Sequence, residues 1–157
     1  MKIVLLLTGK TTEPWIRSAI ESYEKRLKHY VGFQIEVIPD LKSTKNLTED
    51  QIRTREGEMI LSWNRPGDRM ILLDERGTEY SSVQFADFMQ KVLNAGTRQL
   101  VLVVGGAYGF APEVYAACPE RLSLSKMTFS HQMVRIFAVE QLYRAFSILH
   151  NSPYHHE

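Results

Sequence analysis

The segment VLVVGGAYGF, residues 101–110, contains the pattern on which the fold assignment depends. A run of apolar, mostly β-branched residues ends directly at Gly105 and Gly106, and Gly109 follows three positions later. Such a run is typical of a buried strand, and glycines directly after it let the backbone approach a ligand closely. The segment therefore predicts a strand that leads into a nucleotide-binding loop, although a simple tight turn would use the same glycines.

The sequence on both sides of this segment alternates between short apolar runs and longer amphipathic ones. Two amphipathic runs open with a capping-box pattern, Thr48 with Gln51 and Ser81 with Gln84, which is typical of helix starts. Strands are expected at 2–8, 33–38, 69–73, 99–104 and 122–124, and helices at 13–30, 48–63, 81–94, directly after Pro112 and at 131–149. This alternation predicts one α/β domain over residues 1–157, with a mostly parallel sheet and helices on both faces. Ligands of such sheets bind at the carboxyl ends of the strands.

Composition limits the partners and the compartment. The formal net charge is only +1 over 157 residues, whereas proteins that hold free nucleic acid through its phosphates are usually more basic. An RNA partner is therefore expected to be met by local patches or within a larger particle. Cys118 is the single cysteine, which excludes an internal disulfide and suits a reducing cytoplasm. No run approaches the roughly 18–20 apolar residues of a membrane span, so no membrane association is expected.

The glycine loop departs from two common nucleotide-binding fingerprints. A dinucleotide-binding loop has the spacing G-x-G-x-x-G after the first strand and an acidic residue about 20 positions later. Here the spacing is G-G-x-x-G after the fourth expected strand, and the residues SLSKMTF at 123–129 contain no carboxylate. The chain also lacks the G-x-x-x-x-G-K-[ST] pattern of a P-loop. A flavodoxin-like or Rossmann binder of FMN or NAD remains one alternative class.

A second candidate binding segment is LSLSKMTFSHQMVRIF, residues 122–137. Its hydroxyl residues before the apolar run are Ser123, Ser125, Thr128 and Ser130. Hydroxyl and backbone groups without carboxylates suit a neutral heterocycle such as adenine better than a triphosphate, which requires lysine and magnesium. Ser130 also suits the N-cap of the following helix. A third segment, residues 71–82, is expected to end its strand in a charged turn at 74–77.

The last expected helix, residues 131–149, is apolar nearly all round. Such a helix cannot leave one face in water, so one side should pack on the sheet and the other on a partner. In a short chain the expected partner is a second copy, which predicts a homodimer through this helix. Its few charges, Arg135, Glu140 and Arg144, then either pair with one another or face a site.

Four segments together resemble a known family along essentially the whole chain. They are LLDERG at 72–77, VVGGAYG at 103–109, LSKMTFSHQMVRIFAVEQLYRA at 124–145 and NSPYHHE at 151–157. In order and spacing they resemble the RlmH family, bacterial SPOUT-class methyltransferases that methylate N3 of a pseudouridine in helix 69 of 23S ribosomal RNA. The resemblance implies a cytoplasmic enzyme that acts on assembled ribosomes. It also implies a deep trefoil knot, in which the C-terminal part threads through an earlier loop.

The same resemblance implies S-adenosyl-L-methionine (SAM) as the methyl donor and no metal cofactor. The SAM contacts that it implies are mostly backbone and apolar. They are at Leu73 after the third strand, at Gly105 after the fourth, and in the segment Leu124, Ser125, Lys126, Met127, Thr128 and Phe129. The segment AYGFAP after the double glycine varies in such proteins, so the resemblance assigns no contact to Ala107, Tyr108 or Phe110.

Methylation of an imide nitrogen requires alignment with the sulfonium methyl of SAM and removal of one proton. The candidate bases are His131, Glu140, Tyr154 and His155. His131 equally suits a plain polar position near a helix start, whereas Tyr154 is also a candidate to stack on a base and His155 to bind phosphate. Arg135 and Arg144 are candidates to hold RNA phosphate or to orient the ring. Replacing Arg135 with Ala is therefore expected to abolish methylation while SAM still binds.

Two other functions remain open. A SPOUT methyltransferase of another RNA, such as tRNA, would differ in which RNA accepts the methyl group. A non-catalytic ribosome-binding dimer would bind SAM weakly or not at all. Surface cations at 25–28 and 53–55 are candidates to touch the ribosome, although solvated helix faces have the same pattern.

Overall fold

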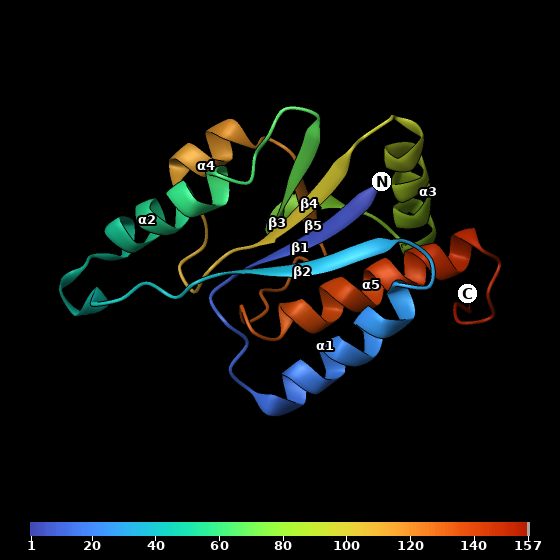
Figure 1. Ribbon diagram of the computed structural model, residues 1–157, viewed down its shortest axis with the longest axis horizontal. Coiled ribbons are helices and arrows are strands. Elements are labelled where there is room, and N and C mark those ends of the chain that lie inside the picture. Colours follow the sequence, from blue (N-terminus) through green and yellow to red (C-terminus); the bar gives the residue numbers. More distant parts are fainter. Residues whose placement is uncertain (157) are drawn as a thin grey trace.

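Five parallel strands form the centre of the molecule (Figure 1). The computed structural model describes residues 1–156, and the strands are β1 (Lys2–Thr8), β2 (Gly32–Ile38), β3 (Asp68–Glu79), β4 (Gln99–Val104) and β5 (Arg121–Ser123). Their order in the sheet is β2-β1-β4-β3-β5, and each neighbouring pair is parallel. The predicted α/β class with a parallel sheet is therefore confirmed.

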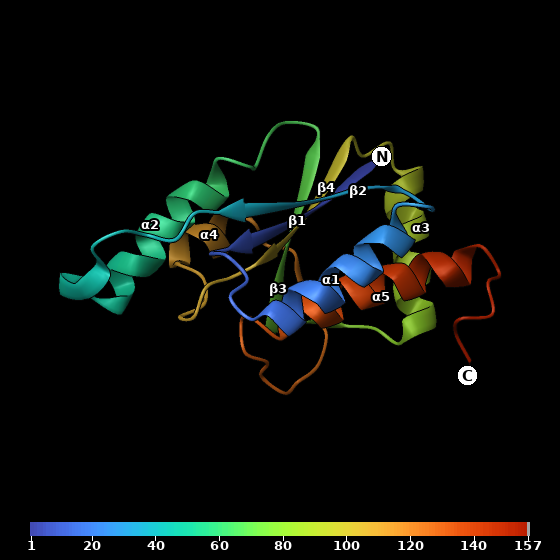
Figure 2. The ribbon, with the colours of Figure 1, turned by 60° about the horizontal axis from the view of Figure 1, so that its bottom comes forward.

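Helices cover both faces of this sheet. On one face, α5 (Val134–Leu149) packs against both α1 (Pro14–Leu27) and α3 (Ser82–Asn94), as Figure 2 shows. On the opposite face, α2 (Glu49–Leu61) packs against α4 (Pro112–Ala117), and a short 3-10 helix, η1 (Thr44–Asn46), precedes α2. Among residues 1–156, no helix is both long and apolar enough to cross a lipid bilayer.

The strands bury side chains on both faces, which explains their continuous apolar sequences. In β1, Ile3, Leu5 and Leu7 belong to the core under α1, α3 and α5. Val4 and Leu6 belong to the core under α2 and α4. Successive residues of a strand point to opposite faces, so one short strand contributes to both cores.

The helix starts follow the local sequence signals. The side chain of Thr48 accepts a hydrogen bond from the Gln51 backbone at 3.1 Å, and the Gln51 side chain accepts one from the Thr48 backbone at 2.9 Å. Ser81 and Gln84 make the same reciprocal pair at the start of α3, at 3.2 and 2.9 Å. Both predicted capping boxes are therefore confirmed, and each satisfies two backbone groups at a helix end.

α5 lies against two helices of its own chain, which covers much of its apolar circumference. Its buried residues include Ala138, Val139, Leu142 and Phe146. Part of the surface that the sequence assigned to a partner subunit is therefore covered by α1 and α3. Phe137 is still 38% exposed, so an apolar side chain of α5 remains open to solvent.

The third strand is longer than the sequence indicated. It was expected to end at residue 73 in a charged turn, but β3 continues to Glu79 because its last residues pair with β5. Leu122 of β5 is the register partner of both Leu73 and Thr78. At Gly77 a Cβ atom would stand 2.6 Å from the carbonyl carbon of Arg121, so only glycine fits where the two backbones meet. The last helix also begins later than expected, at Val134 instead of residue 131, after a turn.

The chain diverges after two neighbouring strands, and this divergence positions the site. After β3 the chain turns to α3 on one face of the sheet, whereas after β4 it turns to α4 on the opposite face. In open α/β sheets such a divergence leaves a crevice at the carboxyl ends of the strands. The crevice here lies beside Leu73 and Gly105.

Candidate functional site

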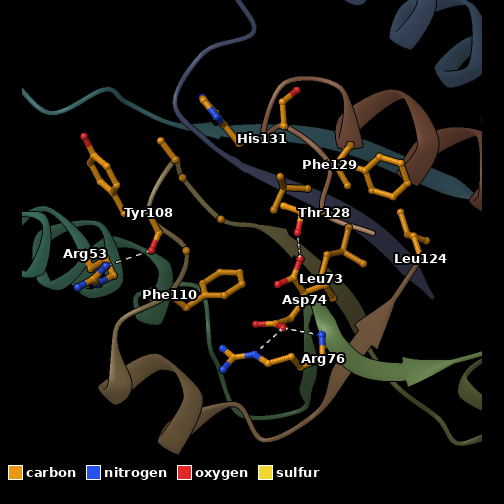
Figure 3. Close-up of a pocket in the computed structure, with 18 of the residues that line it drawn as sticks. Arg53, Leu73, Asp74, Arg76, Tyr108, Phe110, Leu124, Thr128, Phe129 and His131 are labelled. Atoms are coloured by element: carbon orange, nitrogen blue, oxygen red, sulfur yellow. Dashed lines mark hydrogen bonds and ion pairs between the residues drawn. The ribbon is translucent and has the colours of Figure 1, made fainter. Parts of the chain in front are cut away.

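A cavity of about 810 Å³ opens at the carboxyl ends of β3, β4 and β5 (Figure 3). Three segments supply most of its wall: residues 73–76 in the second half of β3, the end of β4 with the loop that follows it, and residues in the range 122–134 from β5 to the start of α5. α2 adds Asp50 and Arg53 at one side. The two segments that the sequence singled out, the glycine loop and the hydroxyl-rich loop, therefore line one cavity.

Most of the expected SAM-contacting residues meet in this cavity. Its wall includes Leu73, Gly105, Leu124, Ser125, Met127, Thr128 and Phe129. Lys126 is not part of the wall, because its side chain is 84% exposed and its Nζ atom lies 3.9 Å from the carboxylate of Glu79. The structure thus brings together seven of the eight positions and leaves one outside; their contacts with SAM stay a prediction.

Local hydrogen bonds shape the loop at 123–129. Ser123 Oγ donates to the carbonyl oxygen of Ser125 at 2.8 Å, and Ser125 Oγ accepts from the backbone nitrogen of Met127 at 3.0 Å. Thr128 Oγ1 donates to the carboxylate of Glu75 (Figure 3). The hydroxyl groups therefore fold the loop on itself and bind it to Glu75 of β3, which leaves an apolar wall that includes Phe129.

Side chains of Phe110 and Glu56 pack closely against the first two glycines of the loop. At Gly105 a Cβ atom would approach the ring of Phe110 to 3.1 Å, and at Gly106 it would approach Glu56 Oε2 to 2.6 Å. Gly109 has a φ of +77°, which favours glycine, and its nitrogen donates to the carbonyl oxygen of Gly106 at 3.1 Å. The glycines thus both make a tight turn and keep the cavity wall close to the backbone.

Charged groups gather at the other side of the cavity. Asp74 accepts hydrogen bonds from the Tyr115 hydroxyl and, at 2.8 Å, from the backbone nitrogen of Arg76. Burial raises the pKa of Asp74, but these bonds outweigh it and hold that pKa below the usual range. The guanidinium carbon of Arg121 lies 4.1 Å from the centre of the Tyr115 ring. Sequence reasoning missed Tyr115, because it comes from a short helix 41 residues after Asp74 and no local pattern marks it.

His131 lines the same cavity. Burial lowers the pKa of its imidazole, and the nearby positive charge of Arg135 lowers it further, although Asp40 acts in the opposite direction. The neutral imidazole is therefore favoured at neutral pH, and a neutral imidazole can accept a proton. Of the four candidate bases, His131 is the one that the structure places in the cavity wall.

Arg135 lies outside the cavity wall and is fully buried. Its guanidinium group donates to the carbonyl oxygens of Thr8 at 3.0 Å and Gly9 at 2.9 Å, to Thr11 Oγ1 at 2.9 Å, and to the carbonyl oxygen of His131 at 2.8 Å. Burial lowers its pKa to about 10, so it stays charged at neutral pH. Its expected contact with RNA stays a prediction, and the contacts present tie the start of α5 to the loop after β1.

The other candidates form a separate cluster around Glu140 and Arg144 of α5. Glu140 Oε1 accepts hydrogen bonds from Tyr154 at 3.0 Å and from Arg144 at 2.6 Å. Tyr154 also pairs with the Tyr23 hydroxyl at 3.1 Å, and Arg144 lies 3.1 Å from Nδ1 of His155. Burial raises the pKa of Tyr154, and its bonds to Tyr23 and Glu140 raise it further, which keeps its hydroxyl protonated. The tail is thus folded onto its own helix.

This cluster is separate from the cavity in the same protomer. His131 lies three residues before the start of α5, whereas the cluster begins at Glu140, six residues or about 9 Å along the helix. The tail follows the end of α5 (Figures 1 and 2), and none of the residues of this cluster belongs to the cavity wall. The structure therefore separates His131 from Tyr154 and His155. Within residues 1–156, no group of three or more His, Cys, Asp or Glu side chains is arranged to hold a metal ion.

Similarity to known proteins defines the class. The family described as "Predicted SPOUT methyltransferase" matches residues 1–155, and the chain belongs to this SPOUT methyltransferase family. Two relatives named ribosomal RNA large subunit methyltransferase H match over their full length. The protein of Phocaeicola vulgatus is 52% identical over 157 residues and that of Porphyromonas gingivalis 54%, with 100% of this chain and 100% of each relative covered. The family expected from the sequence motifs is therefore confirmed.

Solved structures of methylases are more distant. The SpoU methyltransferase AviRb from Streptomyces viridochromogenes, in complex with AdoMet, has a TM-score of 0.48 and 13% identity over 96% of this chain and 59% of its own. A putative methylase family protein from Neisseria gonorrhoeae has a TM-score of 0.49 and 17% identity over 99% of this chain and 85% of its own. At this level of similarity, the family membership rests on the full-length sequence relatives.

Proposed function

We propose that this protein is a SAM-dependent methyltransferase that methylates N3 of a pseudouridine in helix 69 of 23S ribosomal RNA in the assembled ribosome. One observation carries the proposal. A chain similar over its full length to relatives named ribosomal RNA large subunit methyltransferase H also has a cavity lined by Leu73, Gly105 and most of the 124–129 segment. A ribosomal substrate implies a cytoplasmic enzyme.

The chemistry of the cavity wall fits SAM. Leu73, Leu124 and Phe129 offer an apolar wall for the adenine ring, and Asp74 and Glu75 offer negative charge near a cationic sulfonium. A volume of about 810 Å³ lies within the range of roughly 300–1,000 Å³ for small-molecule sites. Hydrogen bonds within the hydroxyl-rich loop already fix its conformation, so the loop loses little conformational entropy when the ligand binds.

SAM, when bound, supplies a methyl group already activated by its sulfonium. The chain must then hold the acceptor nitrogen in line and take up the imide proton. His131 is our candidate for the base, because it lines the cavity and its lowered pKa favours the form that accepts a proton. Tyr154, His155 and Arg144 are proposed to hold the acceptor RNA.

A site that contains both groups requires a second copy of the chain. In one protomer the cavity wall contains none of the tail residues, so the tail of a partner would have to complete each cavity. Exposed apolar side chains support such a homodimer through α5. Phe137 is 38% exposed and stacks on Phe129 at 4.9 Å between ring centres, beside a groove of about 290 Å³ lined by Tyr80 and Phe85. Replacement of Phe137 with Glu should give a monomer in sedimentation experiments and abolish methylation; a dimer with unchanged activity would contradict this interface.

We also propose that the C-terminal part of the chain is threaded through the segment after β3. The double pairing of Leu122 with Leu73 and Thr78, and the close approach of Gly77 to Arg121, support this. Pulling the chain ends apart in optical tweezers tests it. A knotted chain stays shorter than its fully extended length of about 3.3–3.6 Å per residue, whereas an unknotted chain reaches that length.

Transfer of labelled methyl from SAM to ribosomes that lack this modification tests the proposed function. We expect one label per ribosome, located by mass spectrometry at the helix 69 pseudouridine, and no transfer to a short naked RNA hairpin. Label on tRNA instead would favour a SPOUT methyltransferase of another RNA. No transfer together with no SAM binding in calorimetry would favour a non-catalytic ribosome-binding dimer. FMN or NAD binding would point to the remaining class of nucleotide binder.

A further inference from the structure

Tyr108 has no assigned role, yet its ring stands beside the cavity. Its side chain is 44% exposed, and it belongs to the cavity wall. In the part of the chain that the structure describes, its hydroxyl makes no hydrogen bond and its ring stacks on no other aromatic ring. Aromatic rings are stabilised when they pair with another ring. This ring therefore has both a free face and access to whatever enters the cavity.

The backbone that carries Tyr108 is held firmly. Gly106 and Gly109 form a bridge on either side of it, and the carbonyl oxygen of Tyr108 accepts a 3.3 Å hydrogen bond from Nη1 of Arg53 in α2. Arg53 is itself paired with Asp50. An aromatic ring on such a fixed loop loses little freedom when it binds a flat ligand, which makes it an effective stacking platform.

The cavity has two unlike sides. Figure 3 shows Leu124, Thr128 and Phe129 on one side and Tyr108 with Arg53 on the other. The first side is apolar and built from the loop that we assign to the methyl donor. The second side is polar and reaches solvent: Tyr108 is 44% exposed, and Arg53 pairs with Asp50, which also lines the cavity. An exposed aromatic ring at such a mouth suits the approach of a nucleobase. An acceptor that enters from solvent would meet Tyr108 before it meets the donor.

An RNA base that receives a methyl group on a ring nitrogen must first leave its stack and its pairing partner. The lost stacking energy has to be replaced inside the enzyme, and aromatic side chains replace it in single-stranded RNA recognition. We propose that Tyr108 stacks on a nucleobase of the acceptor RNA at the mouth of the cavity and holds it next to the methyl donor. This inference rests on the proposed function, because it takes RNA as the acceptor.

Three variants separate stacking from other roles of Tyr108. Tyr108→Phe keeps the aromatic ring, Tyr108→Leu keeps apolar bulk without an aromatic face, and Tyr108→Ala removes both. Trp15→Ala is the matched control, because Trp15 is also an exposed aromatic residue, 56% accessible, but lies on α1 outside the cavity wall. Each variant is assayed for the KM of unmodified ribosomes in methyl transfer and, separately, for the Kd of SAM in calorimetry.

We expect Tyr108→Ala and Tyr108→Leu to raise the KM for ribosomes about 5- to 150-fold, the range for loss of one base–aromatic stack. The Kd of SAM should stay within about twofold, and Tyr108→Phe and Trp15→Ala should behave like the wild type. An unchanged KM for Tyr108→Ala, or a weakening of SAM binding that accounts for the whole loss, would overturn the inference. A wild-type protein that methylates no ribosomal RNA would overturn the proposed function and this inference together, which distinguishes the two failures.

Discussion

Nη1 of Arg135 donates a 2.9 Å hydrogen bond to the carbonyl oxygen of Gly9, 126 residues earlier in the chain. The guanidinium group is fully buried, and the acceptors that it reaches are neutral oxygens. Burial lowers the pKa of Arg135 more than the charge of Asp40 raises it, and a buried charge is tolerated only when its donors find acceptors. Arg135 therefore fixes the start of α5, and with it His131, to the loop that follows β1.

Arg135→Met should destabilise the whole protein. It leaves the buried carbonyl oxygens of Thr8 and Gly9 and the half-buried one of His131 without this donor, and each loss at a buried group is worth about 1–3 kcal/mol. We expect a decrease of at least about 3 kcal/mol in the free energy of unfolding, measured by urea denaturation. Arg17→Met, at an exposed position of α1, should change stability little. Unchanged stability with lost methylation would instead support the direct RNA contact that the sequence suggested.

Gly77→Ala should disturb the contact between β3 and β5. The added methyl would stand 2.6 Å from backbone atoms of Arg121, so strands that form the floor of the cavity must move. We expect a loss of about 1–3 kcal/mol of stability and a weaker affinity for SAM in calorimetry. Gly32→Ala is the control, because the nearest atom to its new Cβ is 3.9 Å away. Equal stability and equal SAM affinity of the two variants would contradict the close contact between β3 and β5 at Gly77.

Glu140→Gln should release the C-terminal tail from α5. Glu140 binds both Arg144 and Tyr154, and charge-assisted hydrogen bonds weaken when the carboxylate becomes an amide. We expect faster proteolysis after residue 150, kcat lowered at least about tenfold, equivalent to about 1.4 kcal/mol, and an unchanged Kd for SAM. Glu21→Gln, at an exposed position of α1, serves as the control. A tail that stays as protected as in the wild type would argue against this role.

The folded protein should lose stability as the pH falls below the ordinary histidine value. The pKa of His131 is lowered from 6.5 by burial and by Arg135, so the unfolded chain takes up a proton at higher pH than the folded one. The stability that neutral His131 contributes is therefore fully present above pH 6.5. It is lost as the pH falls toward the lower pKa of His131 in the folded protein. Denaturation of wild type and His131→Asn between pH 7 and pH 5 measures this. If the free energy of unfolding changed with pH in the same way for both proteins, the assignment to His131 would be wrong.

Glu56→Gln should stabilise the protein at neutral pH. Among the residues that the structure describes, Oε1 of Glu56 is the buried side-chain atom that has no hydrogen-bond partner. Burial and the charge of Asp40 raise its pKa above 4.5, so ionisation opposes folding above the raised value and the neutral amide avoids this penalty. The gain in stability of Glu56→Gln over the wild type should vanish as the pH falls toward 4.5. Glu58→Gln, exposed on the same helix, is the control, and an identical gain there would point to net charge instead.

Local signals in the sequence predicted the sheet, most helices and the two loops that line the cavity. The capping boxes at Thr48 and Ser81 act within four residues, and the run before Gly105 contains its own strand signal, so no distant contact is needed to recognise them. The extension of β3 could not be predicted in this way. It depends on pairing with Leu122, more than 40 residues later, whereas the local sequence at 74–77 is charged and typical of a turn.

Individual side chains whose contacts depend on distant parts of the chain could not be predicted either. Arg135 is an arginine on a helix, and such residues are mostly exposed, so its burial follows only from the four distant and local acceptors that surround it. The cluster of Asp74, Tyr115 and Arg121 joins three separate elements. Tyr154 and His155 were grouped with His131 because of their chemistry, but in one protomer they bind Glu140 and Arg144 of α5 and stay outside the cavity wall that contains His131.

The cavity draws its wall from residues on both sides of β5, and the pairing of Leu122 with both parts of β3 completes its floor. During synthesis the first 120 residues can form most of the sheet, but they cannot enclose a ligand. Only a protein made almost to its end, with residue 135 already anchoring the loop after β1, acquires the complete cavity. If the proposed function holds, a truncated translation product therefore lacks the site for the methyl donor.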